Sequence, residues 1–173
     1  LSTAQQNNIH IKPKMASEQP SEMKAWLYSS TANGLEKNLS FDASARAPPA
    51  LHGNNVLVQV LSASLNPADY KVPEMGLVAR KLVIGTPASP GMDFCGRVVV
   101  TGDDATEFSP GQLVFGCLSR PSQFGSLGEY LVASTSLLAP VPEGVEVDHA
   151  ASIGIAGQTA YQSLAGYVSP GDK

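Results

Sequence analysis

The chain has 173 residues, of which 43% are hydrophobic and only 15% are charged, and its formal net charge is −4. This length suits one core of ordinary size, and the 16 glycines and 13 prolines favour many short strands joined by turns over a coiled coil or a plain helical bundle. The negative charge argues against a nucleic-acid or anionic-membrane surface, since either partner needs a clustered positive field.

The first 22 residues are polar and show no periodic pattern, so we expect a disordered tail over residues 1–22. The sequence begins at Leu1, and Met15 and Met23 are both candidate starts. No apolar run approaches the length of a membrane span, and the N-terminus lacks the apolar core of a signal peptide. We therefore expect a cytoplasmic protein.

Strand patterns recur through the middle of the chain, each ended by glycine, proline or a polar turn. The turn Asn33-Gly34 follows the first of them, and a loop is expected over residues 43–54. Such spacing predicts a small barrel or sandwich over residues 23–144. The predicted strands cover residues 23–28, 56–63, 97–101, 112–116, 129–133 and 137–141.

The pattern becomes helical after Gly144. Asp148 is expected to cap a first helix that reaches residue 153, and a break should follow at Gly154 and Gly157. A second helix is predicted over residues 158–165. We expect both helices to expose apolar surface.

Two motifs place polar side chains where ligands commonly bind. The run Asn66-Pro67-Ala68-Asp69-Tyr70-Lys71 follows a strong strand, and its proline forces the chain to turn. Taken alone, an Asn-Pro turn with solvated side chains explains it better. Gly157-Gln158-Thr159 stands at an expected helix start, where free N–H groups favour an anion and where simple capping is the alternative.

The cysteines and histidines do not form a metal site by their spacing. Cys95 and Cys117 are too few for a zinc ribbon or a disulfide framework, and Cys95 lies in an apolar run typical of a core. His10, His52 and His149 lack partners at metal spacing. The sequence also contains neither a G-x-S-x-G nucleophile motif nor a G-x-G-x-x-G phosphate loop.

The motifs become more specific as an ordered series that runs from about residue 23 to residue 173. In order they are Ser-Leu-Asn-Pro-Ala-Asp-Tyr-Lys, Pro-Gly-Met-Asp-Phe-Cys-Gly-Arg-Val, Ser-Pro-Gly-Gln-Leu-Val-Phe-Gly, Gly128-Glu129-Tyr130, and Ala150-Ala151 through Gly157-Gln158-Thr159-Ala160-Tyr161. This series resembles the medium-chain dehydrogenase/reductase superfamily, and most of all its zinc-independent quinone oxidoreductase and enoyl reductase branch.

The resemblance implies a mainly β fold with terminal helices, a GroES-like, partly open β-barrel that holds the substrate side of a cleft. In the family an NADPH-binding Rossmann domain follows. Residues 145–173 would be the helices that lead to it, and the domain itself would be absent from this chain. NADPH is thus the expected cofactor of a full-length member, although this chain alone should not bind it tightly.

The resemblance also implies roles for individual residues. Asn66 and Met92 stand where zinc-dependent relatives carry ligands, and neither is a plausible zinc ligand, so no metal is expected. By similarity, Asn66 and Thr159 would contact the cofactor. Tyr70 and Lys71 are the catalytic candidates, with Tyr70 the possible proton or hydrogen-bond donor.

The leading hypothesis is the N-terminal part of an NADPH-dependent, zinc-independent oxidoreductase that transfers hydride to an activated double bond or a quinone. Its partner would be a small-molecule substrate, and a homodimer is expected only if the Rossmann domain is present. Two alternatives stay open: a non-catalytic GroES-like binding module and an inactive truncated product.

Overall fold

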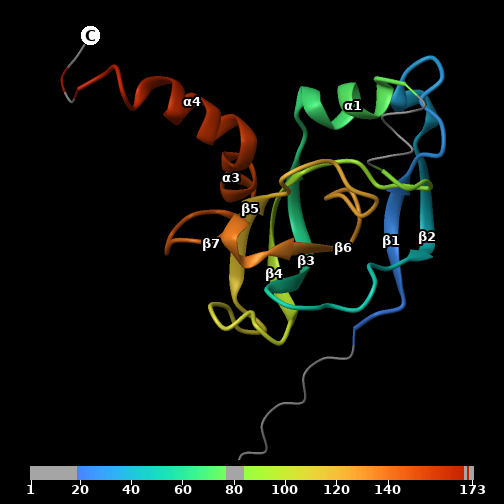
Figure 1. Cartoon of the computed structure of the whole chain (residues 1–173), viewed down its shortest axis with the longest axis horizontal. Helices are drawn as coiled ribbons and strands as arrows, with labels where there is room; N and C mark the ends of the chain where they lie inside the picture. Colours follow the sequence, from blue (N-terminus) through green and yellow to red (C-terminus); the bar gives the residue numbers. More distant parts are fainter. Residues whose placement is uncertain (1–18, 77–83, 170, 172–173) are drawn as a thin grey trace, which may run out of the picture.

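The computed structural model describes residues 19–76, 84–169 and 171. Two β-sheets form its body, and a helical segment leaves the larger sheet near the C-terminus (Figure 1). The smaller sheet pairs β1 with β2, and the larger sheet has the order β6-β3-β4-β5-β7, with every neighbouring pair antiparallel. The strands are β1 (Glu22–Leu27), β2 (Ser40–Arg46), β3 (Asn55–Ser64), β4 (Asp93–Thr101), β5 (Leu113–Cys117), β6 (Tyr130–Ser134) and β7 (Leu138–Pro140).

The larger sheet is organised around β3, which pairs with β4 on one side and β6 on the other. Its run Val56-Leu57-Val58 is completely buried, as expected of a central strand whose two faces are both covered. Gly96 of β4 lies so close to the backbone of Gln59 that a Cβ atom would not fit. A glycine inside the strand therefore permits close contact between the two backbones.

The predicted mainly β fold is confirmed. Its strands form two separate open sheets and not a closed barrel. Each predicted strand has a counterpart, and Asn33 and Gly34 form the expected turn with positive φ angles of 64° and 109°. The strand β2 occupies the start of the expected 43–54 loop and was not predicted. Its side chains are mostly exposed, so it lacks the apolar alternation that marks a half-buried strand.

The segment after β3 is a helix, α1 (Pro67–Glu74), and not the turn that the Asn-Pro pair suggested. Proline at the first helical position is compatible with a helix, since that N–H group would have no intrahelical partner. A short 3₁₀ turn, η1 (Leu35–Asn38), lies against α1, and a second, η2 (Thr135–Leu137), precedes β7.

The C-terminal segment consists of α3 (Val147–Ala151), the π-helix η3 (Ile153–Gly157) and α4 (Gln158–Leu164). The predicted break at the two glycines is therefore wrong, because η3 continues the helix between them. The first helix is also capped at Glu146 and not at Asp148. Figure 1 shows α3 against the larger sheet and α4 extending away from it.

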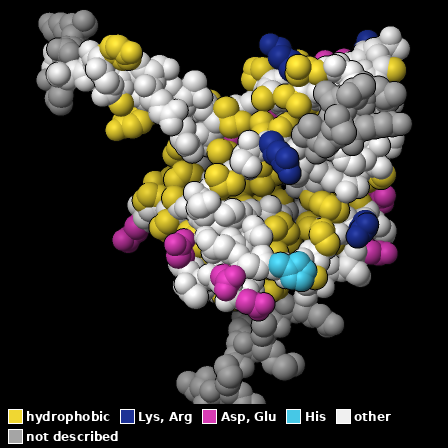
Figure 2. Space-filling view, viewed as in Figure 1, with side chains coloured by type: hydrophobic (Ala, Val, Ile, Leu, Met, Phe, Trp, Pro, Cys, Tyr) yellow, Lys and Arg dark blue, Asp and Glu magenta, His cyan; other side chains and the backbone are white. Residues whose placement is uncertain are grey.

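The main core lies within the larger sheet, and α3 covers part of it. Cys95 is completely buried against Ala150 and Ala151 of α3, which confirms its predicted place in the core. In contrast, α4 buries none of its residues, and Tyr161 and Leu164 are exposed as expected. On the face shown in Figure 2, apolar side chains gather between the base of the C-terminal helices and the α1 side.

The predicted tail overlaps the described residues only at 19–22, and its first 18 residues lie outside them. There the Gln19 side chain donates hydrogen bonds to the carbonyl oxygens of Pro48 and Pro49, and β1 begins at Glu22. The first strand thus begins one residue before its predicted start at residue 23. Within the described part of the chain, every helix is too short or too polar to cross a bilayer.

Candidate active site

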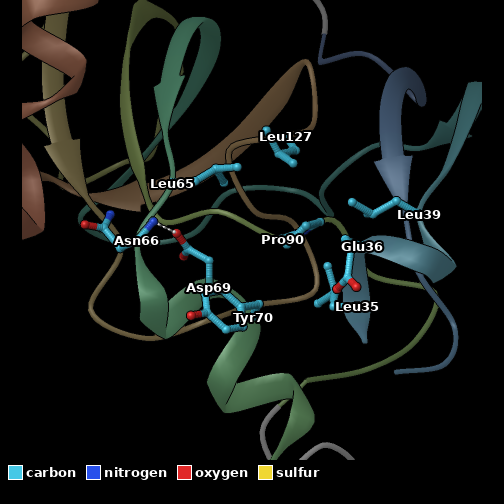
Figure 3. Close-up of a pocket in the computed structure, with 9 residues that line it drawn as sticks. All are labelled: Leu35, Glu36, Leu39, Leu65, Asn66, Asp69, Tyr70, Pro90 and Leu127. Carbon is cyan, nitrogen blue, oxygen red and sulfur yellow. Dashed lines mark hydrogen bonds between the residues drawn. The ribbon is translucent and has the colours of Figure 1, made fainter. Parts of the chain in front are cut away.

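A pocket of about 250 Å³ opens between the first turns of α1, the η1 turn and two loops (Figure 3). Its walls are mainly apolar, and a few polar groups converge on it from α1 and η1, which is the usual composition of a small-molecule site. The lining residues are Leu35, Glu36, Leu39, Leu65, Asn66, Asp69, Tyr70, Pro90 and Leu127.

The start of α1 is fixed by a contact between two of these lining residues. The backbone N–H of Asn66 donates to Oδ2 of Asp69 at 2.6 Å, drawn as the dashed line in Figure 3. Asp69 is the third residue of the helix, so its carboxylate acts as the reciprocal half of a capping box. Asn-Pro-x-Asp is a helix-start pattern, and this signal in the sequence could have predicted α1.

Asp69 is almost completely buried, with 4% of its surface exposed. Burial raises the pKa of its carboxyl group; the hydrogen bond from the Asn66 N–H opposes this shift, and the nearby charge of Asp93 adds to it. Its second oxygen, Oδ1, is buried without a hydrogen-bond partner among the described residues. Asp69 therefore holds a proton more readily than an exposed aspartate does.

Asp93, the first residue of β4, is a buried acceptor for three parts of the chain and was not among the predicted site residues. Its Oδ2 accepts from Asn66 Nδ2 at 3.0 Å and more weakly from Ser64 Oγ at 3.4 Å. The backbone N–H of Ile155 lies 3.0 Å from Oδ1 and 2.9 Å from Oδ2. A Cβ atom on Gly154 would collide with the same carboxylate.

These contacts join the end of β3, the start of α1 and the η3 helix at one carboxylate. An acidic residue at the start of an otherwise apolar strand is a signal that sequence reasoning could have used, because a buried carboxylate requires partners.

A side-chain hydrogen bond joins the far wall of the pocket to α1. The backbone N–H of Leu35 donates to Oε1 of Glu74 at 2.7 Å. Since Glu74 is the last residue of α1, this bond connects the C-terminal end of the helix to η1. The width of the pocket thus depends on both ends of α1.

The structure brings together two of the four predicted site residues. Asn66 and Tyr70 both line the pocket, with Asn66 largely buried and Tyr70 44% exposed. Lys71 is the next residue on α1, but it is exposed and does not line the pocket. Thr159 lies on the exposed α4 helix, also outside the lining.

The described residues hold no cluster of three or more histidine, cysteine, aspartate or glutamate side chains placed to bind a metal ion. Cys95 and Cys117 are free thiols, and burial raises the pKa of both. The absence of a metal in the active protein stays a prediction, based on Asn66 and Met92 at the positions described above.

Comparison with known proteins places the chain in a family. Residues 52–143 match the model of the alcohol dehydrogenase GroES-like domain. The chain is 43% identical over 158 residues to the trans-enoyl reductase pgmF of Aspergillus terreus. The aligned region covers 87% of this chain and 44% of that protein. It is 33% identical over 154 residues to the chloroplastic NADPH-dependent alkenal/one oxidoreductase of Arabidopsis thaliana, covering 84% of this chain and 38% of that one.

Among solved structures, the quinone oxidoreductase from Coxiella burnetii superimposes with a TM-score of 0.72 at 33% identity, over 84% of this chain and 45% of that one. The chain thus spans less than half the length of these three proteins. With its two open sheets and the matched region between β2 and the helices, the chain belongs to the alcohol dehydrogenase GroES-like domain family, within the medium-chain dehydrogenase/reductase superfamily of oxidoreductases.

Proposed function

We propose that this chain forms the substrate side of an NADPH-dependent, zinc-independent reductase that transfers hydride to an activated carbon–carbon double bond or to a quinone. The observation that carries the proposal is the pocket at α1, where an apolar cavity of about 250 Å³ meets the Tyr70 side chain. The similar enoyl, alkenal and quinone reductases support this reaction class.

The chemical task assigned to the chain is to stabilise negative charge. Hydride addition to an enone, an enoyl thioester or a quinone builds charge on the carbonyl oxygen, and a hydrogen-bond donor near that oxygen lowers the barrier. The Tyr70 hydroxyl is a donor that can also give up a proton. The Tyr70 side chain is 44% exposed and lies beside leucine and proline side chains of the pocket wall.

We propose that this chain contacts NADPH only at its nicotinamide end. NADPH, when bound, supplies the hydride. Its phosphates need a cradle such as a glycine-rich loop before a helix, and these 173 residues contain no G-x-G-x-x-G sequence. Asn66 next to the pocket and Thr159 on α4 are the residues proposed to contact the nicotinamide end. Residues outside this chain would hold the phosphates in the longer protein.

The charge of the pocket narrows the substrate class. Both charged residues of its lining, Glu36 and Asp69, are acidic, and the remaining walls are apolar. A free carboxylate would be repelled by these like charges, so the pocket should prefer an uncharged apolar group. Aldehydes, ketones and thioesters with an apolar chain are thus better candidates than free unsaturated acids.

A direct test uses the natural full-length protein, with NADPH as hydride donor and cinnamaldehyde and menadione as acceptors. We expect NADPH oxidation with at least one acceptor, and product analysis should show a reduced carbon–carbon double bond or a hydroquinone. Methyl cinnamate and cinnamate, compared as inhibitors, test the charge preference, and the neutral ester should bind more tightly. Purified protein that oxidises NADPH with neither acceptor would count against the proposal.

The proposal also predicts the metal content of the active protein and its location in the cell. Metal analysis of the active protein should find zinc far below one equivalent, and chelation should leave the activity unchanged. Cell fractionation should place the protein in the cytoplasm. Stoichiometric zinc would overturn the prediction of a zinc-independent enzyme. Protein confined to an organelle fraction would overturn the predicted cytoplasmic location.

A further inference from the structure

The buried carboxylate of Asp93 lies outside the pocket lining, yet it contacts the side chain of a lining residue. Asn66 and Asp93 are 9% and 0% exposed, and 3.0 Å separates Asn66 Nδ2 from Asp93 Oδ2. In Figure 3 the Asn66 amide points away from the other lining side chains. Asp93 is therefore placed to control Asn66 without contacting the pocket itself.

The chemistry of the two groups fixes the orientation of the Asn66 amide. An ionised carboxylate can only accept hydrogen bonds, so the amide must turn its NH₂ group toward Asp93. The amide oxygen Oδ1 then faces away from the carboxylate. An asparagine held in this way offers an acceptor, and not a donor, to a ligand on the side opposite Asp93.

The same carboxylate also holds the backbone of η3. The Ile155 N–H donates to both oxygens of Asp93, and Gly154 leaves room for the carboxylate that no other residue would leave. Any movement of η3 relative to the sheet must therefore change the surroundings of Asp93. The orientation of Asn66 is coupled in this way to the helical segment that carries Thr159.

We propose that Asp93 is a positioning residue, which holds the Asn66 amide with its carbonyl oxygen directed away from the carboxylate and couples that orientation to η3. The ligand group recognised at Asn66 then carries a hydrogen-bond donor, such as an amide NH₂ or a hydroxyl. This inference rests on the proposed reductase function for its kinetic consequences, but its structural part is independent of activity.

The structural part is tested by NMR on the ¹⁵N-labelled chain, without ligand. In the unmodified chain, the Asn66 side-chain NH₂ protons should exchange with solvent at least about tenfold more slowly than those of an exposed asparagine such as Asn54. In Asp93→Asn, the Asn66 side-chain signals should shift and exchange faster, and the Ile155 backbone amide should lose protection. Asp103→Asn removes the same charge beyond the other end of β4 and should change none of these signals.

If Asp93→Asn does not fold, the exchange rate of the Asn66 NH₂ protons in the unmodified chain still tests whether the Asn66 amide is held. Rapid exchange of the Asn66 NH₂ protons would overturn the proposal. Unchanged Asn66 signals in a folded Asp93→Asn variant would overturn it as well.

The kinetic part uses the natural full-length protein, NADPH and cinnamaldehyde or menadione, at a temperature where every variant is folded. Asp93→Asn and Asn66→Asp should each lower kcat/KM by about tenfold or more. The double variant Asn66→Asp/Asp93→Asn re-forms an amide–carboxylate pair with an acceptor at residue 66 directed away from residue 93, and it should recover most of the loss. Asp103→Asn should stay within about twofold of the unmodified protein.

A purely structural Asp93 would lower the melting temperature and leave kcat/KM of the folded variants unchanged, and this result would refute the positioning role. If the unmodified protein shows no reductase activity while the NMR results are as expected, the proposed function fails and the held orientation of Asn66 stands.

Discussion

The backbone N–H of Asn66 and the carboxylate of Asp69 meet at 2.6 Å and join the first residue before α1 to its third residue. This contact links the start of α1 to the buried Asp69 carboxylate, and both residues line the pocket. The pocket is therefore sensitive to changes at residues that a ligand need not touch.

Removal of the Asp69 carboxylate should destabilise the fold. Asp69→Ala leaves the Asn66 N–H without its acceptor, and the loss of such a cap costs about 1–2 kcal/mol. Urea unfolding measures the change. Asp103→Ala, at an exposed position, is the matched control and should lie within about 0.5 kcal/mol of the unmodified chain. Equal stability of the two variants would show that the capping contact is not formed.

The stability of the chain should depend on pH through Asp69. Its native pKa is raised above the ordinary value of 3.8, so the folded state binds its proton more tightly than the unfolded state does. The stabilisation is complete below the unfolded pKa and is lost as the pH rises through the native one. Comparison of the unmodified chain with Asp69→Asn isolates this effect, since the variant cannot titrate.

The free energy of unfolding of the unmodified chain, relative to Asp69→Asn, should decrease as the pH rises from below 4 through the native pKa. A difference that increases over the same window would mean that the native pKa is lowered, and the burial argument would then fail.

Substitution of Gly154 should disturb the Asp93 cluster. A Cβ atom there would overlap the buried carboxylate, and crowding of this kind typically costs about 1–3 kcal/mol. Gly166→Ala is the matched control because a Cβ atom on Gly166 meets nothing within 4 Å. Thermal or urea unfolding should separate the two variants, and equal stability would argue against the close contact between η3 and β4.

The η1 wall of the pocket should loosen when its bond to α1 is removed. Glu74→Ala deletes the acceptor of the Leu35 N–H, at a cost of about 1 kcal/mol for an exposed carboxylate. In the natural full-length protein, we expect KM for an apolar acceptor to increase severalfold and kcat to change less. Glu107→Ala, an exposed glutamate away from the pocket, controls for the lost charge. A KM equal to that of the control would show that Glu74 does not shape the pocket.

The sequence predicted the sheet better than the site. Strands such as β3 follow from continuous apolar runs, and Cys95 follows from its apolar neighbours. The helix α1 was missed because its Asn-Pro start also suits a turn, although Asp69 at the third position already distinguished the two. The predicted cap at Asp148 is wrong because the helix already begins at Val147, with Glu146 at the N-cap position and no side-chain capping hydrogen bond.

The predicted site residues separate for a physical reason. Tyr70 and Lys71 are adjacent in sequence, but successive residues on a helix point about 100° apart, so only Tyr70 reaches the pocket. Asp93 can be recognised as a site residue only once its hydrogen-bond partners are known. These partners, Ser64, Asn66 and Ile155, come from separate parts of the chain. Tertiary contacts of this kind are not encoded in local spacing.

We propose that the α1 pocket holds the reacting group of an uncharged acceptor beside the Tyr70 hydroxyl. The test is a comparison of kcat/KM for NADPH-dependent reduction of cinnamaldehyde or menadione by the natural full-length protein and by its Tyr70→Phe variant. Tyr167→Phe serves as the control. We predict a loss of about 10²-fold for Tyr70→Phe, the usual effect of removing a hydrogen-bond donor or general acid, and an unchanged value for the control. Full activity in a folded Tyr70→Phe variant would show that the Tyr70 hydroxyl takes no part in the reduction.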